Sequence, residues 1–555
     1  MFRGASRKLI KSILSFRTLR TTNALGEDGQ FCEIPKGMDK YLTCRKDVKL
    51  QVCLIDDQMV NPCWDKPCVV IVGAGIAGLA AAQRLLCCGI TNVIILEATD
   101  RPGGRIHSCW MGENIVEVGA DYIEGASITN AAYALAAIEG LLDPPIVPET
   151  ETKGLACTSS GDIVCPFVTM AATCTFKSIL ERTRRLFKEC PAGTQCGSLC
   201  EFIGREIEKN IMIYPCKYRS LAARVMISRL IDLKSKIGAN LQDVSACQFG
   251  AKRELVGGNV RIRTGMVGIL ASYLRSITDC TKIRYCKPVG KIVWCDLPKR
   301  PRAKVFCCDG DVFCADYVIL TPSLGVMKEK ADSMFDPSLP ASKLEAIKTM
   351  GFGNINHLYL EYDKPFWVWN EGNMLLGWNN DELYDPSCCW LTGIGSIKEL
   401  PFSQQIMQIT VGGIRANHIE TASDTSLAED VTGLYRKFLK NPTIPYPVNV
   451  LKSKWGESPF FRGARSYYNL KTKPETICDL ARPVPVACGG DIPVLLFAGE
   501  HTASGDHGTI HGARASGVRE AERILELTKK FQGAPKDLEP CLLEREQKSI
   551  KQQAS

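Results

Sequence analysis

The chain reads Val69-Val-Ile-Val-Gly73-Ala-Gly75-Ile-Ala-Gly78 near its start, which is typical of a buried strand, a tight glycine turn and the beginning of an apolar helix. Gly73 permits the sharp turn, Gly75 lets the backbone approach a pyrophosphate, and Gly78 lets the helix pack closely on the strand. The pyrophosphate would lie at the helix N-terminus, where unpaired N–H groups favour an anion. The next strand, 92–97, ends in Glu97, an acid placed to bind a ribose hydroxyl.

A second glycine pair follows this acid, in Glu97-Ala-Thr-Asp-Arg-Pro-Gly-Gly104-Arg105. A nicotinamide enzyme has no use for a second clamp on the phosphate side here, whereas a large, permanently held dinucleotide does. The distant Phe497-Ala-Gly-Glu500-His would complete the same site, because Glu500 follows a buried strand and is set to hydrogen-bond a ribityl or ribose group. The residues therefore favour a flavin over a nicotinamide.

These stretches resemble the flavin amine oxidase family, whose members carry the same E-A-x-x-R-x-G-G-R segment and hold FAD. The resemblance extends over residues 67–530 and is closest to polyamine oxidases of the spermine oxidase type. Further matching stretches are Glu117-Val-Gly119-Ala120, Pro288-Val289, Ala315 to Val326, Trp455-Gly-Glu-Ser-Pro459, Gly499-Glu500-His501-Thr502 and His511-Gly-Ala513.

The resemblance implies an FAD-dependent polyamine oxidase with oxygen as the electron acceptor. A hydride would pass from the carbon beside the amine nitrogen to flavin N5, giving an aldehyde, a shorter amine and hydrogen peroxide. The implied substrates are spermine, spermidine or their acetylated forms. The implied cofactor-binding residues are Gly73, Gly75, Gly78, Glu97, Gly104, Arg105, Val289, Glu500, Thr509 and Ile510.

Glu124 lies in Gly119-Ala-Asp-Tyr122-Ile-Glu124, at a position where plant polyamine oxidases carry glutamate and vertebrate spermine oxidases carry histidine. A carboxylate near the reacting nitrogen could pair with an ammonium through a short charge-assisted bond. The alternative is a loop or capping acid in water, which is the usual setting of glutamate. We expect Glu124 to act in catalysis and substrate binding, with Tyr122 beside the substrate.

Two residues depart from the family on the flavin side. His357 occupies the place of a lysine that holds a water against flavin N5 in active members. Imidazole is shorter and planar and titrates near pH 6.5, but it can still hold a water; the alternative is a strand histidine without a role. Thr509 replaces a tyrosine beside the flavin and substrate, which removes an aromatic face worth roughly 0.5–2 kcal/mol toward a cation.

The first hypothesis is an active oxidase in which His357 is a catalytic residue. The two departures also support a second hypothesis. The chain could be a flavin-binding homologue with weak or no oxidase activity that serves as a scaffold. Histone-lysine demethylation ranks last, because no nucleosome-binding helical insert is visible between residues 332 and 465. Tyr467, Tyr468, Trp390 and Trp455 could supply aromatic surface, although such residues more often lie in cores.

Composition narrows the partners and the location. The net charge is +8, but six basic residues before position 21 supply +6 of it, leaving about +2 (8 minus 6) elsewhere, which argues against nucleic acid. This basic, acid-free start, within residues 1–25, is typical of a mitochondrial transit peptide, with a cytoplasmic location as the alternative. No apolar run is long enough to span a bilayer. Oligomeric state cannot be read from the sequence.

The 27 cysteines favour structural thiols in a reducing, intracellular setting, because a chain of 555 residues does not need disulfide stapling. Adjacent pairs such as Cys87-Cys88 and Cys307-Cys308 would form strained bridges. His501, His507 and His511 cannot share one helix face, because Gly505 and Gly508 interrupt a helix there, so we expect no metal.

We therefore predict an α/β protein with a discontinuous, Rossmann-like FAD-binding domain and an inserted α+β substrate-binding domain. The predicted FAD-binding segments are 67–150, 250–331 and 466–530, and the substrate-binding segments are 151–249 and 332–465. Residues 1–66 form an extension and 531–555 a polar tail. The active site should lie where the two domains meet, at the carboxyl ends of the parallel strands.

Overall fold

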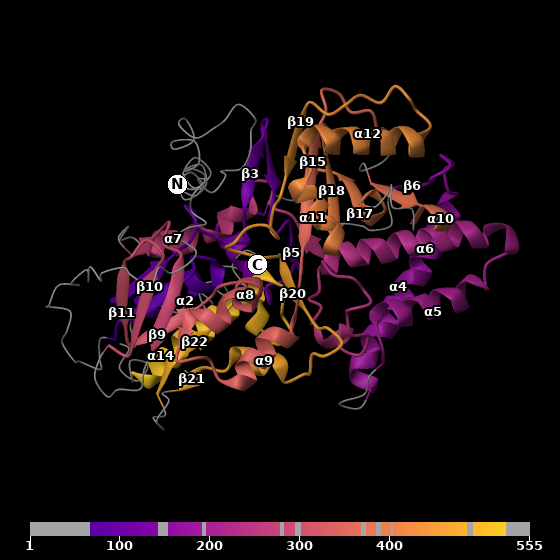
Figure 1. Ribbon diagram of the computed structural model, residues 1–555. Coiled ribbons are helices and arrows are strands. Elements are labelled where there is room, and N and C mark those ends of the chain that lie inside the picture. The colour runs from indigo at the N-terminus through magenta and orange to yellow at the C-terminus, as the bar shows by residue number, and fades with distance from the viewer. Residues whose placement is uncertain are drawn as a thin grey trace, which may run out of the picture.

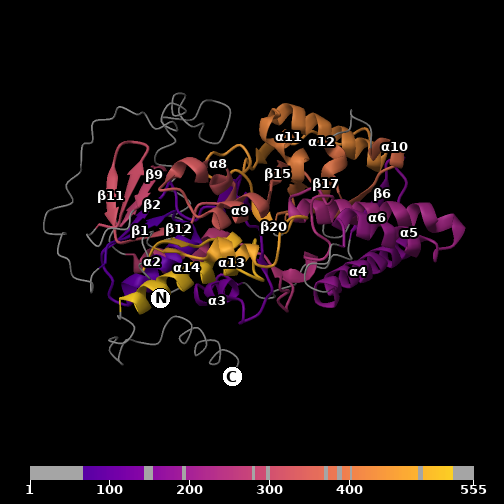
Figure 2. The same ribbon diagram turned by 60° about the horizontal axis from the view of Figure 1, so that its bottom comes forward.

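The computed structural model describes residues 67–142, 154–190, 196–277, 282–294, 301–367, 373–383, 390–400, 403–485 and 492–528. The predicted transit peptide, the rest of the N-terminal extension and the polar tail lie outside these ranges. Figure 1 shows two bodies side by side, and the view in Figure 2 separates them in the same way. No helix in the described ranges combines the length and the apolar character needed to cross a bilayer.

The first body is built on a mainly parallel sheet. Strand β1 (Val69–Val72) pairs in register with β2 (Val93–Leu96) on one side and with β12 (Tyr317–Leu320) on the other, and β12 pairs with β22 (Pro493–Phe497). All four residues of β1 are buried, as expected for a strand covered on both faces. The edge strands are β8 (Ile283–Arg284) and β21 (Val484–Pro485), and the order is β21-β22-β12-β1-β2-β8.

Helices α2 (Ile76–Cys87) and α14 (Ile510–Leu527) cover one face of this sheet and pack on each other. Their approach depends on glycines. A Cβ on Gly78 would lie 2.0 Å from the carbonyl oxygen of Gly73, and a Cβ on Gly517 would lie 1.9 Å from the carbonyl oxygen of Ala77. Contact this close leaves no room for a side chain at either position.

A four-stranded sheet covers the other face, in the order β11-β10-β9-β13. Its strands are β9 (Val289–Trp294), β10 (Ala303–Cys307), β11 (Val312–Ala315) and β13 (Phe335–Asp336). These strands form a separate layer, because consecutive strands with short connections pair antiparallel with each other. Helices α8 (Leu324–Met334) and α9 (Ala341–Thr349) pack into the same core.

The second body holds a mostly antiparallel sheet between helices. Its strands are β6 (Leu155–Thr158), β15 (Ile355–Glu361), β16 (Met374–Gly377), β17 (Ile394–Glu399), β18 (Ile406–Gly412) and β19 (Asn449–Lys452), in the order β19-β15-β18-β17-β16-β6. Helices α4 (Pro166–Glu189), α5 (Leu199–Ile211) and α6 (Cys216–Ile237) lie on one side, and α12 (Asp424–Leu439) lies on the other (Figure 1). This arrangement confirms the predicted α/β fold with an α+β second unit.

Short strands in the described ranges form separate two-stranded sheets. These are β3 (Ser108–Met111) with β4 (Asn114–Glu117), β5 (Ile123–Glu124) with β7 (Asn259–Val260), and β14 (Gly351–Gly353) with β20 (Arg465–Tyr467). The remaining helices are α3 (Ala131–Ile138), α7 (Ala271–Ser276), α10 (Asn380–Leu383), α11 (Ala416–Thr421) and α13 (Thr476–Ala481).

Many of the described cysteines, among them the buried Cys157 and Cys307, are thiols. One disulfide bond, between Cys196 and Cys247, stands among cysteines that were expected to be structural thiols in nearly all cases. The two residues are 51 positions apart, and the chain brings their Cα atoms to 5.5 Å when it returns past the start of α5 after α6. The spacing of these two cysteines in the sequence does not predict that they meet.

Candidate active site

A cavity of about 700 Å³ opens at the carboxyl ends of the parallel strands. Its wall includes Val72 and Leu96, which end β1 and β2, and Thr321, which follows β12. This is the edge at which open α/β sheets bind their ligands. The same cavity continues to His357 on β15 and Glu124 on β5, so it runs between the two bodies.

All but one of the predicted cofactor residues line this cavity. Its wall contains Gly73, Gly75, Glu97, Gly104, Arg105, Val289, Glu500, Thr509 and Ile510, whereas Gly78 packs beneath the glycine turn. A Cβ on Gly75 would meet nothing within 4 Å, so the space beside the turn is open. Gly75 caps α2 without a side-chain hydrogen bond, which leaves the first N–H groups of the helix for an anionic ligand.

Glu97 fixes the glycine turn to the end of β2. Its buried carboxylate accepts hydrogen bonds from the N–H of Ala74 at 2.7 Å, from the N–H of Thr99 at 2.9 Å and from the Thr99 hydroxyl at 2.7 Å. A carboxylate can accept about four hydrogen bonds. One site therefore remains for the ribose hydroxyl that the sequence predicted.

Glu500 is held between distant segments. It accepts from Arg105 at 2.8 Å, from the N–H of Gly508 at 2.7 Å and from the Ser466 hydroxyl. Burial alone would raise the pKa of Glu500, but the charges of Arg105 and His501 outweigh it and hold the pKa at about 2. Together with the open glycine turn and the long cavity, this fixed ion pair fits a dinucleotide with an extended second half, as FAD has.

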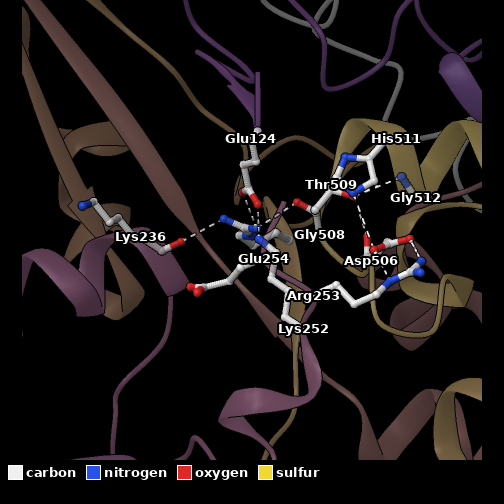
Figure 3. Close-up of polar contacts among 12 residues, drawn as sticks. Glu124, Lys236, Lys252, Arg253, Glu254, Asp506, Gly508, Thr509, His511 and Gly512 are labelled. Carbon is white, nitrogen blue, oxygen red and sulfur yellow. Dashed lines mark hydrogen bonds and ion pairs between the residues drawn. The ribbon is translucent and has the colours of Figure 1, made fainter. Parts of the chain in front are cut away.

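Elsewhere on the wall, Glu124 forms a cluster with two cations, Lys252 and Arg465, here called the Glu124 cluster. Lys252 forms an ion pair with one carboxylate oxygen, and Arg465 approaches the other at 3.2 Å. Figure 3 shows the Glu124 side chain pointing into this group of nitrogens. One carboxylate with two cations gives the cluster a formal charge of +1 when all three are ionised.

The charges of the cluster shift its pKa values in opposite directions. Burial would raise the pKa of Glu124, but Lys252 and Arg465 overcome this and hold it at about 2. Burial, followed by the nearby charge of Arg465, lowers the pKa of Lys252 to about 8. Glu124 is therefore ionised throughout the neutral range, whereas Lys252 titrates just above it.

Backbone contacts keep the cluster in place. Arg465, the first residue of β20, donates to the carbonyl oxygen of Gly508 at 2.9 Å and to that of Lys236 at 3.2 Å. The next residue after Lys252 is Arg253, whose N–H donates to the carbonyl oxygen of Gly505 at 2.7 Å. Arg253 also forms an ion pair with Asp506 (Figure 3). The cluster thus joins β20 to the loop before α14.

His357 lies buried in the middle of the second sheet and on the cavity wall. Its Nδ1 is 3.0 Å from the Thr410 hydroxyl and 3.3 Å from the Gln408 amide nitrogen. Because an amide nitrogen only donates, this arrangement assigns Nδ1 as the acceptor and places the ring proton on Nε2. Burial lowers the pKa of His357 despite the opposing charge of Asp121, so the ring is neutral at physiological pH.

Thr509 has a local structural role as the N-cap of α14. Its hydroxyl accepts from the N–H of Gly512 at 3.0 Å and donates to the carbonyl oxygen of Asp506 at 2.6 Å. Threonine is a favoured residue at this position of a helix. Thr509 and Tyr122 both line the cavity, as the predicted substrate contacts require.

The aromatic surface of the cavity differs from the candidates named from the sequence. Trp455 lines it and packs edge-on against Phe461, with ring centroids 4.9 Å apart. Trp390 and Tyr468 are buried in cores away from this wall. Phe461 was missed, although it closely follows the Trp455–Pro459 motif.

Charged residues near His357 were also missed. Asp121 pairs with Arg261 at 3.2 Å, and Lys398 lines the same wall. Burial would raise the pKa of Asp121, but Arg261, His357 and Lys398 outweigh it and lower the pKa. Asp121 stands three residues before Glu124 and could have been noticed for that reason, whereas Arg261 and Lys398 carry no spacing signal.

The three C-terminal histidines do not gather into a metal site. Burial lowers the pKa of both His501 and His507 to about 4, and His511 lies 3.6 Å from Asp506. In the part of the chain that the structure describes, the only group of three potential metal-ligating side chains within reach of one ion is Cys190, Cys196 and Cys247.

Comparison with known proteins places these features in a family. The model of the flavin containing amine oxidoreductases matches residues 76–525. Human peroxisomal N(1)-acetyl-spermine/spermidine oxidase is 32% identical over 497 residues, covering 83% of this chain and 95% of the relative. Protein anon-37Cs of Drosophila simulans is also 32% identical, over 494 residues, covering 86% of this chain and 95% of the relative.

Solved structures agree on the fold. The structure of putrescine oxidase bound to putrescine superposes with a TM-score of 0.63 at 18% sequence identity, and the match covers 83% of this chain and 99% of that one. At 18% identity this similarity supports the fold and nothing further. None of these matches supports the scaffold hypothesis that His357 suggested.

Proposed function

The chain belongs to the flavin containing amine oxidoreductases, and from that premise we propose that it oxidises a polyamine, with an acetylated form preferred over the free amine. FAD is the cofactor, and when bound it supplies the hydride acceptor and the reaction with oxygen. The products would be an aldehyde, a shorter amine and hydrogen peroxide.

One observation carries this proposal: the glycine turn, His357, and Glu124 and Arg465 of the Glu124 cluster line a single cavity. An amine loses a hydride readily only in its neutral form, because the nitrogen lone pair must assist. A neighbouring group of charge +1 lowers the pKa of an approaching ammonium. The Glu124 cluster thus favours the neutral amine, whose N–H the Glu124 carboxylate can accept.

The same charge supports a preference among polyamines. A free polyamine brings several ammonium groups to a wall that already holds Arg465, Arg261 and Lys398, with Lys252 paired to Glu124. Acetylation replaces one terminal ammonium by a neutral amide, whose carbonyl oxygen can accept from a cationic side chain. We therefore expect the singly acetylated substrate to have the lower KM.

His357 and Tyr122 take supporting roles in this proposal. Nε2 of His357, which carries the ring proton, would donate to a water beside flavin N5. Tyr122 lines the wall next to Asp121 and Glu124 and would flank the substrate chain. Both assignments stand on position in the cavity and on the family resemblance.

Oxygen uptake with N1-acetylspermine, spermine and spermidine tests the proposal. We expect hydrogen peroxide and a matching aldehyde, with kcat/KM about tenfold higher for the acetylated amine, a difference of about 1.4 kcal/mol. A higher value for free spermine would contradict the acetyl preference. Absence of uptake with all three amines by FAD-loaded protein would contradict polyamine oxidation.

We also propose an intracellular location, supported by the many free thiols. Residues 1–25 keep their prediction of mitochondrial targeting, which a fusion of this segment to a fluorescent protein would test. Cytoplasmic fluorescence of that fusion would exclude the targeting role.

A further inference from the structure

A group of three cysteines lies outside the cavity wall, where the helices of the second body meet. Cys190 caps the C-terminus of α4, Cys196 precedes α5, and Cys247 follows α6. Cys196 and Cys247 are bridged, and Sγ of Cys190 lies 3.2 Å from Sγ of Cys196. All three sulfurs lie within 4.8 Å of one another. A thiol is therefore in contact with a disulfide.

The three sulfurs differ in their exposure. Cys190 and Cys196 are half-buried, whereas Cys247 is buried, with 5% of its surface exposed. Solvent can therefore accept the Cys190 proton more readily than it can reach Cys247. Because the thiolate is the attacking form in disulfide exchange, Cys190 is the suitable nucleophile.

A backbone contact marks the leaving group. The N–H of Cys196 donates to Sγ of Cys247 at 2.9 Å. A donor aimed at this sulfur would stabilise a thiolate on Cys247 once the bridge opens. Exchange is faster when the departing sulfur is stabilised as a thiolate.

We propose that Cys190, Cys196 and Cys247 form a thiol–disulfide exchange site. The Cys190 thiolate attacks Sγ of Cys196, so that the Cys190–Cys196 bond forms while the Cys196–Cys247 bond breaks. The electron pair leaves with Cys247, which takes up the proton that Cys190 lost to solvent. No electrons enter or leave, so the step needs no external oxidant or reductant.

The surrounding backbone can tolerate this exchange. The N–H of Leu199 donates to the carbonyl oxygen of Val244 at 2.8 Å, and the N–H of Ala246 donates to that of Gly197 at 3.2 Å. These bonds hold residues 244–246 beside residues 197–199 whether or not Cys247 is bridged, and they do not reach the residues after Cys247. While Cys196 and Cys247 are bridged, only Cys190 can be a thiolate. A metal site needs several ligands, so the group suits disulfide exchange better than metal binding.

The site is joined to the Glu124 cluster by a short segment. Four residues separate Cys247 from Lys252, and three of them form a 3-10 turn, Phe249–Ala251, packed on α4. A Cβ on Gly250 would lie 2.0 Å from the carbonyl oxygen of Arg184, so the turn sits directly on the α4 backbone. Release of Cys247 removes the covalent tie at the base of this segment. On the proposed function, this release weakens the placement of Lys252 and changes the KM for the amine.

Disulfide mapping of the FAD-loaded full chain tests the exchange without reference to activity. After incubation at pH 8.5, acid quenching, alkylation and trypsin digestion, Cys190 and Cys196 lie on peptide 189–205 and Cys247 lies on peptide 237–252. Exchange predicts that about a tenth or more of the chains carry an internally bridged 189–205 peptide together with alkylated Cys247. The Cys190→Ser variant should give only the cross-linked pair of peptides, and Cys200→Ser, on the same peptide, should behave as wild type.

Finding only cross-linked peptides in the wild-type protein would overturn the exchange site. The link to Lys252 has its own measurement: Cys247→Ser should change the KM for the amine by about threefold, with FAD content unchanged. An unchanged KM would overturn that link while the mapping result stands. Loss of turnover by the wild-type protein toward every amine would instead count against the proposed function.

Discussion

The guanidinium of Arg105 and the carboxylate of Glu500 are 395 residues apart in the chain and meet at 2.8 Å on the cavity wall. Arg105 also donates to the carbonyl oxygen of Ala464 at 2.8 Å, so the pair fastens the first cofactor segment to β20 and to the segment before α14. The strength of the Arg105–Glu500 ion pair depends on the burial of Glu500 and on the hydrogen bonds that Glu500 accepts.

Glu500→Gln should destabilise the apoprotein and weaken FAD binding. The amide keeps the shape but leaves the charge of Arg105 unbalanced, which we expect to lower the free energy of unfolding by about 2–3 kcal/mol. Urea unfolding of the apoprotein measures this loss, and flavin titration measures the affinity for FAD. Unchanged values in both would contradict a structural role of the pair in the cofactor site.

Glycine substitutions should separate stability from cofactor binding. Gly75→Ala meets no atom within 4 Å and has a negative φ of −68°, so the apoprotein should keep its Tm while FAD binding weakens by at least about tenfold. Gly78→Ala places a methyl group 2.0 Å from the Gly73 carbonyl oxygen and should lower the Tm itself.

Gly433→Ala is the matched control for these variants. Gly433 is a helical glycine in α12 whose Cβ would meet nothing within 4 Å, and it lies outside the cavity wall. This change should leave FAD binding alone and raise stability by about 0.5–1 kcal/mol. Equal effects of Gly75→Ala and Gly433→Ala on FAD affinity would exclude a close approach of the Gly75 backbone to the FAD pyrophosphate.

Charge changes in the Glu124 cluster should move the KM in opposite directions. Glu124→Gln leaves two cations and should raise the KM for an amine by at least about tenfold, whereas Lys252→Met leaves the cluster neutral and should lower it. The pKa of Lys252 is about 8, so its charge is present below that pH and lost above it. The difference between Lys252→Met and wild type should therefore disappear as pH rises through 8. A difference that is constant from pH 6.5 to 9.5 would contradict this reading.

His357→Lys should speed turnover or reoxidation, because lysine offers a longer donor with a fixed charge for the water beside the reaction centre. Stopped-flow measurement of the reductive and oxidative half-reactions separates the two effects. His357→Leu removes the donor at similar volume and should slow the same step. Rates equal to wild type in both variants would rule out a catalytic role.

Acid should destabilise the protein in two stages. His501 and His507 have pKa values of about 4 when folded, below the unfolded value near 6.5, so the unfolded chain binds more protons between these limits. The free energy of unfolding should therefore fall as pH drops from about 6.5 to 4. Glu124 and Glu500, with pKa values of about 2, add a second loss between about 4.5 and 2.

Urea unfolding at pH 7.5, 5.5 and 4.5 checks the first stage. His507→Gln should flatten the slope between pH 6.5 and 4, since one of the two buried rings no longer titrates. Stability that does not change between pH 7 and 5 would contradict the neutral, buried state of these histidines.

The candidate cofactor residues could be named from the sequence, because they depend on local chemistry. Glycines in a tight turn, an acid at a strand end and Glu500 after a buried strand each leave a recognisable pattern.

The substrate end could not be predicted in the same way. Lys252 and Arg465 reach Glu124 from positions 128 and 341 residues away in the chain, and neither stands in a recognisable motif. Glu124 alone suggested an anionic wall, whereas its two partners make the cluster positive. The Cys196–Cys247 bridge was missed for the same reason.

The central claim, that this cavity holds FAD beside an oxidisable polyamine, is tested most directly by anaerobic mixing of the FAD-loaded protein with N1-acetylspermine. The account predicts rapid loss of the oxidised flavin absorbance at about 450 nm, with spermine reacting more slowly. Persistent yellow colour with acetylspermine, spermine and spermidine alike would contradict it.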